Sequence, residues 1–208
     1  MLIKNIKSLV QIEDHPVKNV AGKNMQNLNT IENAFLLIND DVISDFGKME
    51  DCPGSDEEII DASGKLVFPS YCDSHTHLVY AGSREIEYGD KIRGLSYEEI
   101  AARGGGIVNS SKLLQQTSED DLYEQSMVRI NEIIKMGTGA VEIKSGYGLT
   151  TESELKMLRV IKRIKETSPG TVISTFLGAH SIPVEYRHDQ SKYVDIVIHE
   201  MIPEVAAM

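Results

Sequence analysis

The chain has 208 residues, of which 41% are hydrophobic and 25% charged, the composition of an ordinary globular protein. Its formal net charge of -11 excludes the basic footprint that non-specific nucleic-acid binding requires. The two cysteines, Cys52 and Cys72, form no Cys-x-x-Cys or disulfide pattern, and Cys72 is interpreted as a small buried apolar residue. No apolar run reaches the length of a membrane span and no signal peptide begins the chain, so we expect a cytoplasmic protein without a membrane partner.

Residues 1–66 are predicted to form a small β-domain. Residues 34–47 contain two short apolar runs separated by Asn39, Asp40 and Asp41, a pattern typical of a β-hairpin. Residues 59–65 add a short strand and a turn, and no chemistry is expected in this part of the chain.

From residue 67 to residue 208 the pattern changes to strands that alternate with helices. Strands are expected in the apolar run 65–69 that leads toward residue 77, and in 140–149 and 171–180; helices are expected to begin near 118, 151 and 191. This β-α order, repeated three times, predicts a parallel sheet.

Smaller signals refine this second region. Residues 89–106 are predicted to be a long connection, and their three consecutive glycines at 104–106 indicate a tight turn or a close approach to a ligand. An acidic start after Ser118 is typical of a helix N-terminus, and the pattern from Thr151 to Glu154 indicates a capping box.

A pair of histidines follows the first strand of this region. His75 and His77 are two residues apart, so in a strand their side chains share one face and can bind one metal ion. Two histidines in an exposed loop would give the same pattern, but the apolar strand before them and the glycine-containing loop after them favour a metal site. The other two strands also end in polar residues, Tyr147 and His180, at the edge where the active site of a (β/α)₈ barrel lies.

Four segments together resemble a known family. They are His75-Thr-His-Leu-Val-Tyr-Ala-Gly-Ser-Arg-Glu85, Arg103-Gly-Gly-Gly-Ile107, Glu142-Ile-Lys-Ser-Gly-Tyr-Gly-Leu149 and Thr175-Phe-Leu-Gly-Ala-His180. They resemble the amidohydrolase superfamily and, within it, the imidazolonepropionase family. The resemblance covers the whole chain but only about the first half of the family's length. It implies an α/β fold in which the first three βα units of a metal-dependent (β/α)₈ TIM barrel, residues 67–208, follow a small β-sandwich-like domain, residues 1–66.

The resemblance also implies a function. Members of the family hydrolyse 4-imidazolone-5-propanoate to N-formimidoyl-L-glutamate in histidine degradation, with one Zn²⁺ or Fe ion. His75 and His77 match two metal ligands, and Arg84, Tyr147 and His180 match substrate-binding positions. The resemblance places no catalytic residue in this chain: the proton-transfer residue and the remaining ligands are expected beyond residue 208. A homodimer is compatible with it.

The residue chemistry agrees with this hypothesis and leaves alternatives. An arginine suits the carboxylate of a small anionic substrate, but Arg84 could instead pair with Glu85 or Glu87 at the surface. Tyr147 could serve packing alone, and His180 could be a structural histidine that is hydrogen-bonded to a neighbouring backbone group. Lys144 is interpreted as a structural residue or as one that lies behind the metal ligands. For the whole chain, the alternatives are another cyclic amidohydrolase or aminohydrolase of the superfamily, or a non-catalytic, truncated half-barrel with an unpaired strand edge.

Overall fold

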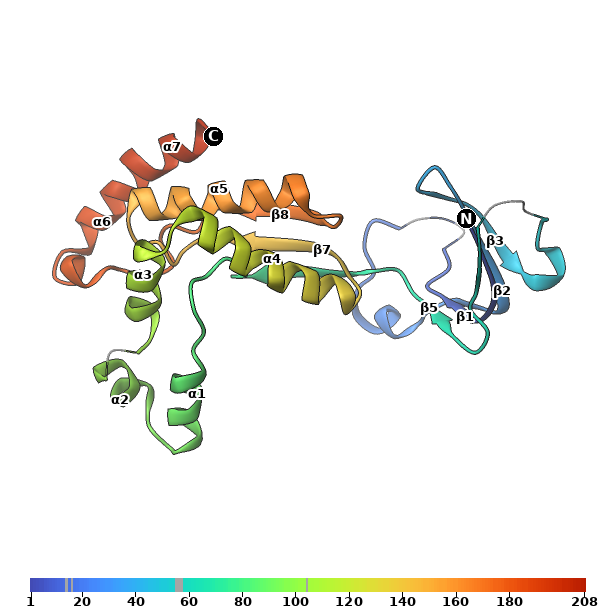
Figure 1. Ribbon diagram of the computed structural model, residues 1–208, viewed down its shortest axis with the longest axis horizontal. Helices are drawn as coiled ribbons and strands as arrows, with labels where there is room; N and C mark the ends of the chain where they lie inside the picture. The colour runs from blue at the N-terminus through green and yellow to red at the C-terminus, as the bar shows by residue number, and fades with distance from the viewer. Residues whose placement is uncertain (14, 16, 55–57, 104) are drawn as a thin grey trace. The chain divides into compact units, whose positions relative to one another are not determined.

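The computed structural model describes all residues except 14, 16, 55–57 and 104, and the chain separates into two compact units, Met1–Pro69 and Ser70–Met208 (Figure 1). The predicted boundary, between residues 66 and 67, lies slightly earlier. The difference arises because the apolar pair Leu66–Val67 forms a strand of the first unit.

The first unit contains a five-stranded sheet. Its strands are β1 (Leu2–Val10), β2 (Thr30–Asn39), β3 (Val42–Lys48), β4 (Ile59–Asp61) and β5 (Leu66–Val67), and short 3₁₀ turns occupy Gly22–Gln26 and Met49–Asp51. The sheet order is β3-β2-β1-β4, and β5 also pairs with β1. β1 runs antiparallel to β2 and parallel to β4 and β5. The described residues of this unit form one sheet, so the sandwich-like arrangement stays a prediction.

The predicted hairpin is confirmed. β2 and β3 pair antiparallel, and Asn39 faces Val42 across the two-residue loop Asp40-Asp41. Both loop residues have positive φ angles, 50° and 62°, as a type I′ turn requires. Aspartate tolerates this left-handed conformation better than most residues, which is why the Asp-Asp pair can close the hairpin.

The second unit is built on three parallel strands in chain order, β6-β7-β8, as predicted. The strands are β6 (Tyr71–Thr76), β7 (Thr138–Lys144) and β8 (Thr171–Thr175). The helices are α1 (Glu85–Ile92), α2 (Tyr97–Ala102), α3 (Ile107–Gln116), α4 (Glu119–Lys135), α5 (Thr151–Thr167), α6 (Gln190–Ile196) and α7 (Ile202–Ala206), with a 3₁₀ turn at Val184–Tyr186 and a π-helical turn at Val197–Met201.

One face of this sheet forms the core with α4 and α5, which run alongside it in Figure 1. Val141 and Ile143 of β7 are buried in this core, together with apolar side chains of both helices. Because side chains alternate along a strand, Glu142 and Lys144 lie on the opposite face, where both are partly buried.

The strand before the histidine pair differs from the prediction. The apolar run 65–69 does not form it: Leu66–Val67 belongs to the first unit, and the strand is β6. Among the described residues β6 lies at the edge of its sheet and pairs with β7 alone, so most of its side chains are exposed. Cys72 is one of them, and its predicted burial is therefore wrong.

The segment predicted as a long connection, 89–106, contains helical structure. α1 extends into it, and α2 lies within it. The start of α2 is stabilised by a reciprocal capping box in which Ser96 N donates to Glu99 Oε2 at 2.7 Å and Glu99 N donates to Ser96 Oγ at 3.2 Å. This Ser-x-x-Glu signal was present in the sequence. Gly104, the first of the three glycines, lies outside the described residues.

Helix starts were predicted with mixed success. α4 begins at Glu119, with the acidic first turn that was predicted, and Ser118 caps it by accepting a hydrogen bond from Asp121 N. The capping box predicted from Thr151 to Glu154 is wrong, because Thr150 caps α5 by accepting from Ser153 N. The carboxylate of Glu154 turns instead toward the loop that precedes the helix. Within the described residues, no helix has both the length and the apolarity needed to cross a membrane.

Candidate active site

The histidine pair lies at the carboxyl end of β6. His75 is the fifth residue of the strand and is exposed, whereas His77 follows the strand and is partly buried. Their ring centroids are 5.7 Å apart. Between them, the hydroxyl of Thr76 donates to the carbonyl of Glu142 at 2.8 Å and thereby ties the end of β6 to β7.

Two further predicted site residues lie beside His77. Tyr147 comes from the loop after β7, and its ring meets the His77 ring edge-on with centroids 4.9 Å apart. His180 comes from the loop after β8 and stacks on His77 at 4.7 Å, with 29° between the ring planes. The prediction that His180 ends its strand is wrong, because β8 already ends at Thr175. The connecting loop nevertheless returns it to the same edge of the sheet.

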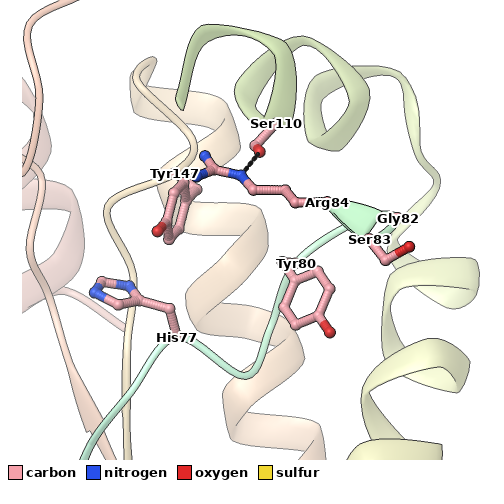
Figure 2. Close-up of a pocket in the computed structure, with 7 residues that line it drawn as sticks. All are labelled: His77, Tyr80, Gly82, Ser83, Arg84, Ser110 and Tyr147. Atoms are coloured by element: carbon pink, nitrogen blue, oxygen red, sulfur yellow. Dashed lines mark hydrogen bonds between the residues drawn. The ribbon is translucent and has the colours of Figure 1, made fainter. Parts of the chain in front are cut away.

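Arg84 and His77 line a pocket of about 280 Å³ (Figure 2). Its lining residues are His77, Tyr80, Gly82, Ser83, Arg84, Ser110 and Tyr147. Arg84 Nε donates to Ser110 Oγ at 2.9 Å, which directs the guanidinium along the pocket wall toward Tyr147. The guanidinium carbon is 5.8 Å from the centre of the Tyr147 ring.

The alternative interpretation of Arg84 was a surface ion pair with a neighbouring glutamate. The structure contains such a contact, but it is long. Glu87 Oε2 is 3.9 Å from Arg84 Nε, and the other oxygen of Glu87 accepts from Gly106 N at 2.9 Å. The side chain of Arg84 is 42% exposed. An ion pair of this length and exposure contributes little, so the guanidinium is available to an anionic ligand.

His77 has the properties of a metal ligand. Its Nδ1 atom is buried and has no hydrogen-bond partner. Burial lowers the pKa of the ring, and the charges of His180 and His75 lower it further, against the opposing effect of the carbonyl groups of Ser145 and Lys144. A neutral imidazole is the form that binds a metal ion. In the described part of the chain, no three His, Cys, Asp or Glu side chains converge as a metal site. The assignment of His75 and His77 as two metal ligands therefore stays a prediction.

Lys144 and Glu142 form an ion pair on the same face of the sheet as the site. Glu142 also accepts a hydrogen bond from Thr175 Oγ1 at 2.5 Å, which joins β7 to β8. The bond from Lys144, and then the bond from Thr175, lower the pKa of Glu142. Lys144 is thus engaged in an ion pair with a neighbouring side chain of its own strand.

Sequence reasoning missed the residues that orient the candidate site. Ser110, which directs Arg84, carries no pattern of its own. Tyr80 was visible only as part of the segment that follows the histidines. Glu154 was noticed, but as a helix cap, and its partners are the backbone N–H groups of the Tyr147 loop.

Several solved structures share the fold of this chain. The chain matches a 5-methylcytosine deaminase from Klebsiella pneumoniae with a TM-score of 0.55 and 18% identity, over 94% of this chain and 42% of that one. It matches a guanine deaminase from E. coli with a TM-score of 0.54 and 16% identity, over 95% of this chain and 42% of that one. At this level of identity the similarity shows the fold alone, which is an α/β fold.

Curated relatives are more specific. The chain is 58% identical over 207 residues to an imidazolonepropionase from Christiangramia forsetii, and 55% identical over 206 residues to one from Flavobacterium johnsoniae. Each alignment covers 99% of this chain and 50% of the relative. The chain is thus homologous to the N-terminal half of imidazolonepropionases and spans about half the length of the curated relatives it matches. No family model matches the chain.

Proposed function

We propose that this chain is the N-terminal part of an imidazolonepropionase, which hydrolyses the cyclic amide of 4-imidazolone-5-propanoate to N-formimidoyl-L-glutamate in histidine degradation. The observation that carries the proposal is the 58% identity to such an enzyme across 99% of the chain. The grouping of Arg84, Tyr147, His180 and the histidine pair at one edge of the sheet supports it.

Arg84 is proposed to bind the propionate group of the substrate. The substrate is an anion and the chain carries a net charge of -11, so a local cation is needed at the site. A guanidinium can donate two parallel hydrogen bonds to a carboxylate. With Nε held by Ser110, the terminal nitrogens of Arg84 remain for the substrate.

Tyr147 and His180 are proposed to orient the ring of the substrate. Both side chains carry polar atoms and lie against His77, next to the proposed position of the metal. The Tyr147 hydroxyl and an imidazole nitrogen of His180 can hydrogen-bond the carbonyl and ring nitrogens of an imidazolone. This geometry would hold the scissile bond close to the metal ligands.

His75 and His77 are proposed to hold one Zn²⁺ or Fe ion. Such an ion supplies Lewis acidity and a nucleophile at neutral pH when it is bound. The remaining ligands and the residue that takes the proton of the attacking water are proposed to follow residue 208, in the half of the relatives that this chain does not span. Under this proposal no described residue acts as the general base.

The finer architecture and cellular setting belong to the same proposal. Ser70–Met208 would be the first three βα units of a (β/α)₈ barrel, and Met1–Pro69 would be part of a β-sandwich-like domain. The enzyme would work in the cytoplasm on a small-molecule substrate, without nucleic acid or membrane. A homodimer is compatible with this proposal.

The test uses the complete product of the gene that encodes this chain. Purified with metal, it should open imidazolonepropionate, and His75→Ala and His77→Ala should each lose bound metal and activity together. His15→Ala, which removes an exposed histidine of the first unit, is the matched control. Metal content is measured by mass spectrometry. If either variant kept both the metal content and the activity of wild type, the assignment of the pair would be refuted.

A second candidate function follows from the structural similarity to deaminases. A neighbouring aminohydrolase would release ammonia from a cyclic substrate, and another cyclic amidohydrolase would open a different ring. Assaying ring opening and ammonia release on a panel of cyclic amides and amino-substituted bases separates these outcomes from the proposed one.

The third candidate is a non-catalytic half-barrel. In the described sheet, β8 pairs with β7 alone, and Ile173 of β8 is 53% exposed. An edge of this kind favours aggregation. Size-exclusion chromatography of the 208-residue chain is the discriminating measurement, because a clean monomer with two-state unfolding would contradict an aggregation-prone remnant.

A further inference from the structure

We propose that Glu154 is a positioning residue that holds the Tyr147 loop, residues 146–149, in its substrate-binding conformation. The proposal deepens the proposed function, because it assigns a support to the side chain of Tyr147 at that same site. Glu154 lies in the first turns of α5, and its side chain is fully buried.

The carboxylate of Glu154 accepts three hydrogen bonds from the loop. Its Oε1 atom accepts from Gly148 N at 2.7 Å and from Leu149 N at 3.0 Å. Its Oε2 atom accepts from Gly146 N at 2.8 Å. Three of the four backbone N–H groups around Tyr147 therefore converge on one side chain. Hydrogen bonds to an ionised acceptor are stronger than neutral ones, and here they are shielded from water.

These bonds compensate the burial of a charge. No basic side chain forms an ion pair with Glu154 among the described residues, and a buried carboxylate without partners is strongly unfavourable. The three N–H groups and the positive end of the α5 dipole provide the stabilisation. The helix does not need Glu154 as a cap, because Thr150 already fills that role. The carboxylate is thus free to serve the loop.

The loop is also confined on its other sides. The carbonyl of Gly148 accepts from Ser111 Oγ at 3.1 Å and from Gln115 Nε2 at 3.0 Å, both on α3. Gly146 has a φ of 113°, and a Cβ there would lie 2.7 Å from His180 Cβ. The loop is therefore fixed between α3, α5 and the His180 loop, and Glu154 contributes the bonds that act directly on either side of Tyr147.

The consequence is a defined position for the Tyr147 ring. The ring is held 4.9 Å from His77 and 5.5 Å from His180, centroid to centroid. A shift of about 1 Å in a substrate-orienting group can reduce turnover about a hundredfold. Loosening the loop should therefore impair the reaction of bound substrate even though Glu154 touches neither substrate nor metal.

The test compares Glu154→Gln with Glu152→Gln in the complete gene product. Glutamine keeps the shape of Glu154 and one acceptor oxygen, but its NH₂ group cannot accept from Gly146 N. Glu152 is two residues away on the same helix, and its side chain is 77% exposed, so its substitution removes the same charge without touching the loop. If Glu154→Gln fails to fold, Glu154→Asp replaces it in the test. Aspartate keeps the negative charge, but its carboxylate lies one methylene further from the N–H groups of the loop.

Hydrogen exchange followed by mass spectrometry gives the first readout. Residues 146–149 should exchange at least about tenfold faster in the Glu154 variant than in wild type, while β7 keeps its protection and Glu152→Gln behaves like wild type. Unchanged exchange at the loop would overturn the proposal.

A double-mutant cycle with Tyr147→Phe gives the second readout. Glu154→Gln should lower kcat/KM at least about tenfold with unchanged metal content, but clearly less when Tyr147 has already lost its hydroxyl. Equal losses in both backgrounds would mean that Glu154 acts on stability alone and would overturn the proposal. If wild type does not open imidazolonepropionate while the loop still loosens in the variant, the proposed function fails and the assignment of Glu154 as the support of the loop stands.

Discussion

Replacing Arg84 with alanine should chiefly raise KM for the proposed anionic substrate. The guanidinium lies on the wall of the pocket beside Tyr147, and its Nε is engaged by Ser110. The weak contact with Glu87, at 3.9 Å, does not neutralise it. Because Arg84 is proposed to bind the propionate group, which takes no part in the chemistry, its loss should weaken ground state and transition state alike.

The size of the effect follows from the exposure of the side chain. Hydrogen bonds to charged groups contribute roughly 1.5–3 kcal/mol. Arg84 is 42% exposed, so solvent screening places the expected loss near the lower end of that range. At about 1.4 kcal/mol per factor of ten, KM should rise roughly 10- to 30-fold. Ser110→Ala, which removes only the orienting acceptor, should raise KM by a few-fold.

Steady-state kinetics of the complete gene product measures both parameters. Lys91→Ala, which removes a positive charge from the last turn of α1, is the matched control for the change in net charge. Arg84→Lys should recover part of the affinity, because it keeps the charge but loses the paired donors. Unchanged KM in Arg84→Ala would refute carboxylate binding by this residue. A fall in kcat with unchanged KM would instead place it at the reacting bond.

Two further predictions concern stability. Gly148→Ala should destabilise the second unit by about 1–3 kcal/mol, since the new Cβ would lie 2.4 Å from the backbone nitrogen of Glu154. The control is Gly89→Ala, where nothing lies within 4 Å of the added atom, and this variant should be neutral or stabilising in thermal unfolding. Equal effects of the two substitutions would contradict the clash. The pKa of Asp61 is lowered below 3.8, above all by the hydroxyl of Ser63, so its stabilisation of the first unit should be present above pH 3.8 and be lost as the pH falls through the lowered value. Asp61→Asn should therefore unfold at lower urea concentration than wild type at pH 7, and the difference should shrink as the pH falls below 3.8. A pH-independent difference would refute this account.

The sequence indicated the parallel order of β6, β7 and β8 correctly, and that order brings the site together. In a parallel sheet the carboxyl ends of successive strands share one edge. Residues that follow β6, β7 and β8 must therefore meet there, even though Tyr147 and His180 are more than thirty residues apart in the chain. The exact limits of the strands mattered little for predicting the site. β8 ends five residues before His180, and the loop after the strand still brings His180 against His77.

Errors arose where one local pattern fits two structures. The apolar run 65–69 has the composition of a buried strand in either unit, and only its pairing with β1 decides that it belongs to the first. Cys72 was expected to be buried because its neighbours were taken to be covered on both faces. An edge strand with one described neighbour does not have that cover.

Glu154 shows why supports of a site are harder to predict than its principal side chains. Its position three residues after Thr151 fits a capping box, and its separation of five to eight residues from Leu149, Gly148 and Gly146 has no periodic signature. Only the fold reveals that the helix is already capped by Thr150 and that the loop's N–H groups point at the carboxylate. A histidine pair or an arginine can be recognised by what it could bind. A positioning residue is defined by what it touches, and contacts of this kind depend on how the loop folds back onto α5.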